Sequence, residues 1–218
     1  MSAVPRRTDT TPGEALVVVA LCFGWPILLS LRVVLGGFQG GPQGFSTLGA
    51  LFTVGFEIVV SLVAFALLRG RGYDVASLVP QPAWRDSAVG VALLVAAWIG
   101  GALATAPLAA DWSEQPITRI MQDSFVLPPV ALLMSVVNGA FEEVFLLGFL
   151  GRGLRGFGLS IALGVPLLVR VSYHLYQGPL GATWMLAAGL VFGLYHARAQ
   201  RLWPVVFAHM LWDFLAFM

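Results

Sequence analysis

Hydrophobic residues along this chain gather in seven long runs, which short polar or glycine-rich connections separate. The runs cover approximately residues 15–35, 47–68, 87–107, 126–150, 158–176, 180–197 and 202–218. Most of them approach the ~20 residues that an α-helix needs to cross the hydrocarbon core of a bilayer. The connections contain glycine or proline, which suits turns between helices. The pattern therefore predicts an all-α, polytopic membrane protein with about seven transmembrane helices.

The composition supports this fold class and indicates which kinds of partner the protein has. Hydrophobic residues make up 58% of the 218 positions and charged residues 11%, and the mean hydropathy is +0.86. Soluble domains carry roughly 25% charged residues, so the expected partner is the lipid bilayer. The formal net charge is only +1 and the basic residues are scattered, which argues against a nucleic-acid partner.

The arginines predict how the chain is oriented in the membrane. If the N-terminus is cytoplasmic, the inner connections hold Arg6, Arg7, Arg69, Arg71, Arg85, Arg152, Arg155, Arg198 and Arg201. The outer connections then hold Arg119 alone. Because positive residues are enriched in cytoplasmic loops, we expect a multi-pass protein of the plasma membrane with its N-terminus in the cytoplasm.

Two adjacent carboxylates, Glu142 and Glu143, interrupt the fourth apolar run. An ionised carboxylate costs about 2.5 kcal/mol or more at the centre of a membrane helix, and such residues mark functional sites by default. Asn138 precedes Glu142 by one helical turn and is expected to support it. A further carboxylate, Glu57, lies in the second run without an evident partner in the sequence.

Later segments carry residues that could compensate the glutamates. Arg170 and His174 are spaced i,i+4 in the fifth run, as are His209 and Asp213 in the seventh. This spacing places each pair on one face of a helix. We therefore expect the chemistry of the protein where these faces meet.

Three stretches together carry a resemblance to a known family. Residues 141–150 read FEEVFLLGFL, residues 173–178 read YHLYQG, and residues 202–213 run from LWP to HMLWD. A pair of glutamates, a downstream histidine and a terminal HxxxD motif on successive helices resembles the CAAX-protease and bacteriocin-processing (Abi-like) family of intramembrane endopeptidases. The resemblance predicts two parts. Residues 1–125 form an N-terminal tail with three transmembrane helices, and residues 126–218 form a catalytic core of the last four helices.

The sequence departs from the family's motifs at two positions. Leu147 stands where the family's EExxxR motif has its arginine, and Arg170 stands where its FxxxH motif has phenylalanine. The arginine gained at position 170 can compensate for the one missing at position 147, because a buried carboxylate is tolerated when it is paired. We therefore expect Arg170 to replace the missing arginine.

The resemblance also implies roles for the remaining residues. It implies that Glu142 is the base that activates water and that His174 assists Glu142. Glu143 is then the second catalytic carboxylate. It implies further that His209 and Asp213 hold the oxyanion or the water. Zinc bound by His174 and His209 is an alternative, although the sequence lacks an HExxH motif, the arrangement in which zinc ligands and base share one helix. The implied substrate is a membrane-embedded or lipidated peptide, which would enter from the cytoplasm.

Helix lengths place one condition on this site. Counted from the cytoplasmic ends at ~1.5 Å per residue, Glu142 and His209 lie at similar depths, whereas His174 lies about 12–14 Å deeper. The three can meet only if the fifth helix begins late or tilts strongly.

Other functions remain open at this stage. An ion or proton transporter would also bury carboxylates and histidines, but the chain has no repeated halves of the kind many transporters have. A b-type cytochrome with His174 and His209 as haem ligands disagrees with the carboxylates beside both histidines. An inactive family member that acts as a membrane scaffold is compatible with Leu147.

Overall fold

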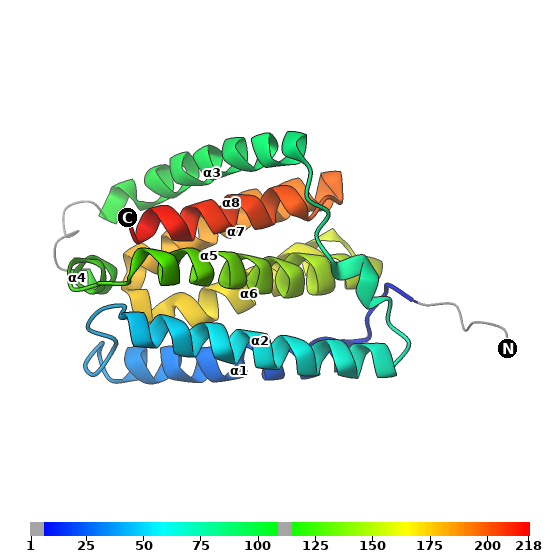
Figure 1. The fold of residues 1–218 in the computed structure, drawn as a ribbon, viewed down its shortest axis with the longest axis horizontal. Helices are drawn as coiled ribbons and strands as arrows, with labels where there is room; N and C mark the ends of the chain where they lie inside the picture. The colour runs from blue at the N-terminus through cyan, green and yellow to red at the C-terminus, as the bar shows by residue number, and fades with distance from the viewer. Residues whose placement is uncertain (1–6, 109–114) are drawn as a thin grey trace, which may run out of the picture.

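The computed structural model describes residues 7–108 and 115–218 as a bundle of helices (Figure 1). The bundle consists of long helices joined by short helical turns. The longer helices are α1 (Pro12–Leu35), α2 (Thr47–Gly70), α3 (Trp84–Thr105), α5 (Pro128–Glu143), α6 (Leu159–His174), α7 (Gly178–Ala199) and α8 (Trp203–Ala216). The shorter elements are η1 (Val75–Leu78), α4 (Pro116–Gln122), η3 (Val144–Gly151), η4 (Arg155–Phe157) and η5 (Leu175–Gln177). Each of the seven apolar runs thus forms a helix, and the predicted fold class is confirmed.

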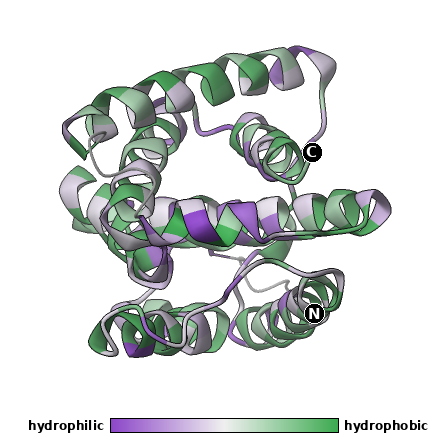
Figure 2. Ribbon diagram, turned by 90° about the vertical axis from the view of Figure 1, so that its left-hand side faces the viewer, coloured by the Kyte–Doolittle hydropathy of each residue, from purple (hydrophilic) through white to green (hydrophobic). Residues whose placement is uncertain are grey.

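Five helical stretches are long and apolar enough to cross a membrane. They are Pro12–Leu35, Thr47–Gly70, Trp84–Leu108, Pro128–Gly151 and the continuous stretch Leu159–Ala199, which contains α6, η5 and α7. The helix α8 is apolar but shorter. Figure 2 faces the end of the bundle that carries α4, and there the long helices are coloured mostly hydrophobic. The protein is therefore a multi-pass membrane protein.

The last four long helices lie at the centre of the bundle. The helix α5 packs between α2 and α8, α6 packs between α1 and α7, and α3 covers α7 and α8. The division of function between residues 1–125 and 126–218 stays a prediction, since α1, α2 and α3 all pack directly on the later helices.

The chain segments at the two ends of the bundle are tied together by different contacts. At one end, Thr10 N donates to Gly153 O and Arg152 donates to the Oγ of Ser77 at 2.8 Å. At the other end, Phe45 N donates to Ser124 Oγ at 2.7 Å. We call the first the arginine-rich end and the second, which carries α4, the α4 end. Eight of the described arginines lie in segments of the arginine-rich end: Arg7, Arg69, Arg71, Arg85, Arg152, Arg155, Arg198 and Arg201.

The helix that carries the glutamates changes its winding directly after them. The segment η3 is a π-helix, and all of its residues are buried. Short π-helical segments inside α-helices occur frequently at functional sites. The glutamate pair therefore lies at the junction of two helical geometries, above a solid apolar plug that closes the bundle towards the arginine-rich end.

The fifth predicted helix does not begin late. It begins at Leu159, directly after Gly158, which has a φ of +100°. The expectation of a late start, offered as one way to bring His174 to the glutamates, is therefore wrong. The residues of α6 that bond to the glutamates are Arg170 and Tyr173.

Candidate functional site

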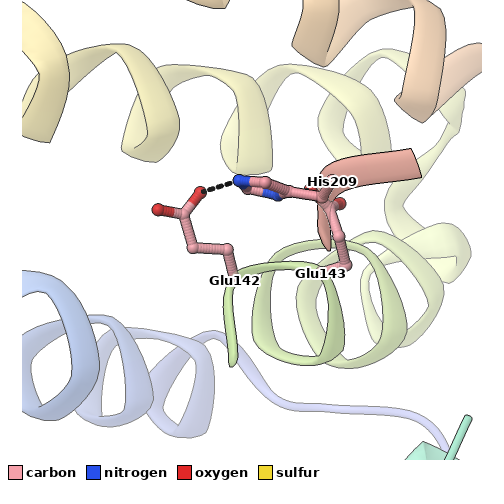
Figure 3. Close-up of side chains that lie close together, drawn as sticks. All are labelled: Glu142, Glu143 and His209. Carbon is pink, nitrogen blue, oxygen red and sulfur yellow. Dashed lines mark hydrogen bonds and ion pairs between the residues drawn. The ribbon is translucent and has the colours of Figure 1, made fainter. Parts of the chain in front are cut away.

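The two glutamates at the end of α5 have different surroundings. Glu142 is 5% exposed and Glu143 is fully buried. Figure 3 shows that their side chains leave the helix in different directions, with the His209 imidazole close to both. Of the two, only Glu142 is among the described residues that line the large cavity of the bundle. The adjacent carboxylates therefore differ in their access to a substrate.

Glu143 holds two cationic or basic side chains on one oxygen. Its Oε1 accepts a hydrogen bond from Arg170 Nη2 at 2.6 Å and lies 2.7 Å from His209 Nδ1. Two glycines allow these approaches. A Cβ on Gly139 would lie 2.9 Å from Met210 N of α8, and one on Gly189 of α7 would lie 3.1 Å from Arg170 Cδ. Glu143 thus fixes the position of His209, and its charge is balanced by Arg170. This ion pair is the one expected if Arg170 replaces the family's arginine, which is missing at position 147.

His209 lies between three carboxylates. With Nδ1 directed to Glu143, its Nε2 lies 3.9 Å from Glu142 Oε2 and 3.6 Å from Asp213 Oδ1. Both distances exceed a direct hydrogen bond, and a separation beyond about 3.5 Å between polar groups is one that a water can bridge. His209 and Asp213 both line the cavity. The Nε2 side of the imidazole is therefore the side that faces the cavity.

Glu142 has partners that the sequence did not reveal. Its Oε2 accepts a hydrogen bond from the Tyr173 hydroxyl at 2.5 Å, and Asn138 Nδ2 lies 3.4 Å from its Oε1. The same Nδ2 donates to Glu57 Oε1 at 2.7 Å. Asn138 thus connects Glu142 with the carboxylate of α2 that had no evident partner. Tyr173 precedes His174 in the sequence, but no spacing rule singled it out.

His174 lines the same cavity but stands apart from the glutamate contacts. Its Nδ1 lies 2.9 Å from the carbonyl oxygen of Arg170, one turn earlier in α6. A carbonyl oxygen can only accept, so Nδ1 is the donor of this bond, and in the neutral imidazole Nε2 is then free to accept a proton. Of the five residues predicted to be catalytic, Glu142, His174, His209 and Asp213 line the cavity and Glu143 lies behind it.

The cavity has a volume of about 1160 Å³ and occupies one half of the bundle. From the glutamates it extends to the connection between α1 and α2, to α4 and to the end of α8, where Pro42, Gln122 and Phe217 line it. These segments belong to the α4 end. The arginine-rich segments and the α4 end, to which the cavity extends, lie at opposite ends of the bundle. A cytoplasmic N-terminus and a cavity that opens to the cytoplasm therefore cannot both hold.

The residues around Glu143 fit a zinc ion poorly. Glu142, Glu143 and His209 each offer one atom within 4.8 Å of the others, so the donor number would suffice. The close oxygen of Glu143, however, already has a guanidinium nitrogen at 2.6 Å, and a second cation at that oxygen would be repelled by it. His174, which the alternative zinc site would pair with His209, is not in this group. The charge of Arg170 therefore disfavours a metal ion beside Glu143.

The link from Glu57 through Asn138 to Glu142 predicts the effect of one substitution. Asn138→Leu keeps the approximate shape of the side chain but removes both hydrogen bonds. The buried carboxylate of Glu57 then loses its donor, and among the described residues Glu142 keeps only the hydrogen bond from Tyr173. The cost of about 1–3 kcal/mol for such a group corresponds to roughly 5- to 150-fold in rate if it falls on the reactive carboxylate. The cleavage rate of the variant, measured in detergent, should be lower than that of the wild type by a factor in this range.

Ser135→Ala is the matched control for Asn138→Leu. Ser135 is buried about one turn earlier in α5, and among the described residues its hydroxyl bonds only to the carbonyl oxygen of Ala131 in the same helix. Its replacement should leave the cleavage rate nearly unchanged. Equal rates for wild type and Asn138→Leu would show that the link does not reach the reacting group.

Comparison with known proteins finds a match for the part of the chain that contains most of these residues. A family model described as type II CAAX prenyl endopeptidase, Rce1-like, matches residues 124–215. The matched range contains both glutamates, Arg170, both cavity histidines and Asp213, but not Glu57. The match agrees with the family that the motifs predicted for residues 126–218. No curated protein and no solved structure matches the chain.

Proposed function

We propose that this protein, whose residues 124–215 belong to the Rce1-like family of type II CAAX prenyl endopeptidases, hydrolyses a peptide bond of a membrane-associated protein or peptide. One observation supports this most directly. A cavity-facing carboxylate, Glu142, lies beside an imidazole, His209, that a buried second carboxylate holds in place. A base whose partner is oriented by a third group is the arrangement that activates a nucleophile.

Glu142 acts as the general base in this proposal. A water between Glu142 and His209 gives a proton to the Glu142 carboxylate, and its oxygen attacks the carbonyl carbon of the peptide bond. When the tetrahedral intermediate collapses, the carbon–nitrogen bond breaks and Glu142 returns the proton to the amine that leaves. Asn138 and Tyr173 hold the two oxygens of Glu142, which keeps the carboxylate directed at the cavity.

His209 stabilises the charge that develops on the carbonyl oxygen. Its Nδ1 is engaged by Glu143, so that Nε2, when it carries a proton, is the donor directed at the reaction space. Donors that are aimed in advance at a developing oxyanion are usually the largest single contribution to catalysis. Asp213 and His174, which line the same cavity, position the water and the substrate.

Arg170 completes the site by balancing charge. It is 4% exposed and is bonded to Glu143. A buried ion pair persists only when its geometry is good and its remaining donors are satisfied. The pair keeps Glu143 ionised, and an ionised Glu143 keeps the imidazole of His209 in one orientation.

The proposal is tested by peptide profiling of membranes. Cells that produce the wild-type protein and cells that produce Glu142→Ala should differ in a small set of membrane-associated peptides, each with a new terminus present only with wild type. Identical peptide sets would instead favour the scaffold function that Leu147 keeps open. Wild-type and variant protein amounts, measured in the same membranes, provide the control.

Catalysis by glutamate and histidine without a metal predicts resistance to chelators. Incubation of the detergent-purified protein with 1,10-phenanthroline should leave the cleavage rate within about 2-fold of the untreated rate, because the guanidinium of Arg170 occupies the position beside Glu143. The non-chelating 1,7-phenanthroline is the control. Loss of activity with 1,10-phenanthroline alone, restored by added zinc, would contradict the glutamate mechanism.

A further inference from the structure

The position of the cavity relative to the arginines bears on the side from which a substrate arrives. Cytoplasmic loops are enriched in arginine and lysine, and eight of the described arginines lie in segments of the arginine-rich end. At that end, Arg201 pairs with Asp86 at 2.8 Å and Arg152 bonds to Ser77. The enrichment of arginine in cytoplasmic loops therefore assigns these segments to the cytoplasmic face.

No described residue of that face lines the cavity. Between the glutamates and the arginine-rich end lies η3, whose residues are all buried and pack into apolar clusters with α1, α2 and α3. A peptide cannot pass this plug without unfolding it. The cavity walls come instead from the halves of the long helices that point to α4.

The cavity also reaches the lipid-facing surface of the bundle at this end. Trp25 of α1 and Phe52 of α2 both line it and are 56% and 72% exposed. Leu29, which also lines it, is 41% exposed. Apolar side chains that are shared between a cavity wall and a lipid-facing surface favour an occupant that is itself apolar.

The depth of the site sets the length of that occupant. Glu142 lies ~20 Å from Pro128, the first residue of α5 at the α4 end, at ~1.5 Å per residue. An extended peptide covers at most ~3.3–3.6 Å per residue, so about six residues are needed to bring a scissile bond to Glu142. A folded helix advances only ~1.5 Å per residue and presents its carbonyl groups to its own amides.

From these observations we infer that the substrate enters from the extracytoplasmic side as an extended, apolar peptide segment of at least about six residues. The inference rests on the proposed function for the chemistry, but not for the direction of entry. It places the substrate among membrane-anchored or exported peptides with an unfolded apolar segment next to the outer surface of the membrane. A cytoplasmic substrate would meet the closed end of the bundle.

Cysteine labelling in membrane vesicles tests the direction of entry. The background is Cys22→Ser, since Cys22 is the single cysteine. Thr53→Cys reports on the cavity wall, Gln39→Cys on the α4 end, and Gly156→Cys on the arginine-rich end. Gly156 suits this purpose because a Cβ there meets no atom within 4 Å.

A membrane-impermeant maleimide should label Thr53→Cys and Gln39→Cys in right-side-out vesicles, and Gly156→Cys only in inside-out vesicles. Labelling of Thr53→Cys only in inside-out vesicles, whichever way the other two behave, would overturn the inference. Failure to label Thr53→Cys in either kind of vesicle would overturn it as well, because the cavity would then be closed to both sides.

Protection from labelling tests the occupant. An octapeptide of alanine and leucine, added outside right-side-out vesicles, should slow the labelling of Thr53→Cys at least 5-fold and leave that of Gln39→Cys unchanged. The same protection is expected in the Glu142→Gln background, so the result does not depend on catalysis. Absence of protection would overturn the extended apolar occupant, while the proposed hydrolysis would still be decided by peptide profiling.

Discussion

Glu142→Gln is expected to lower the rate of peptide cleavage by roughly 10²- to 10⁴-fold, the contribution that a positioned general base makes. The amide keeps the size of the carboxylate and can still accept a hydrogen bond from Tyr173, so the folded protein should remain. It cannot take a proton from water. Cleavage rates and thermal midpoints of wild type and variant, measured in the same detergent, check both statements.

Glu143→Gln is the informative companion because it changes the neighbouring carboxylate behind the cavity. It removes the charge that holds Arg170 and His209, so both the thermal midpoint and the rate should fall. Glu142→Gln should lower the rate alone. If Glu142→Gln cleaves at the wild-type rate, Glu142 is not the base, whatever the result for Glu143→Gln.

Arg170→Leu is expected to destabilise the protein by about 3–5 kcal/mol, the cost of removing one partner from a buried ion pair. Glu143 is fully buried, and its Oε2 has no hydrogen-bond partner among the described residues. It therefore depends on Arg170 and His209 for compensation. The thermal midpoint should drop, and cleavage at neutral pH should be lost with it.

A second substitution should restore part of this loss. Leu147→Arg in the Arg170→Leu background returns a cation to the position that the family's EExxxR motif gives it, four residues after Glu143. The guanidinium would have to displace apolar neighbours, since Leu147 is 5% exposed within a cluster with α3 and α7. Partial recovery of rate and thermal midpoint is therefore expected, not full recovery.

The decisive comparison is between the two single variants and the double variant. Coupled positions give a double variant that is more stable and more active than the sum of the single effects predicts. Strict additivity would show that Leu147 and Arg170 do not share a partner. Arg170→Lys is the matched control. It keeps the charge but loses the planar fork of the guanidinium, and its effects should be smaller than those of Arg170→Leu.

The helices, the family and the candidate site residues were predictable because their causes are local in the chain. A bilayer requires every backbone polar group to be satisfied within the segment that crosses it, so apolar runs of sufficient length become helices. The i,i+4 spacing of His209 and Asp213 and the adjacency of Glu142 and Glu143 are likewise properties of the chain alone. They were sufficient to find the family and the charged groups that meet.

The different surroundings of the two glutamates were not readable from the sequence, because adjacency says nothing about which residue faces a cavity. That depends on where α8 and α6 approach α5, and the approach depends on space at Gly139 and Gly189. The same holds for Glu57, whose partner Asn138 lies 81 positions away. Contacts between helices distant in sequence are set by packing, which no periodicity records.

The sequence by itself determined the all-α membrane fold, the distribution of arginines and the set of ionisable residues in the central helices. Only the tertiary structure decided that Glu142 faces the cavity, that Glu143 holds His209 and Arg170, and that the cavity extends to the α4 end, opposite to the arginine-rich end. The physical reason is that hydrophobicity and charge act on each segment separately. The position of a cavity instead depends on how all the helices fill space together, and here the buried π-helical segment after Glu143 fills one end and leaves the other open.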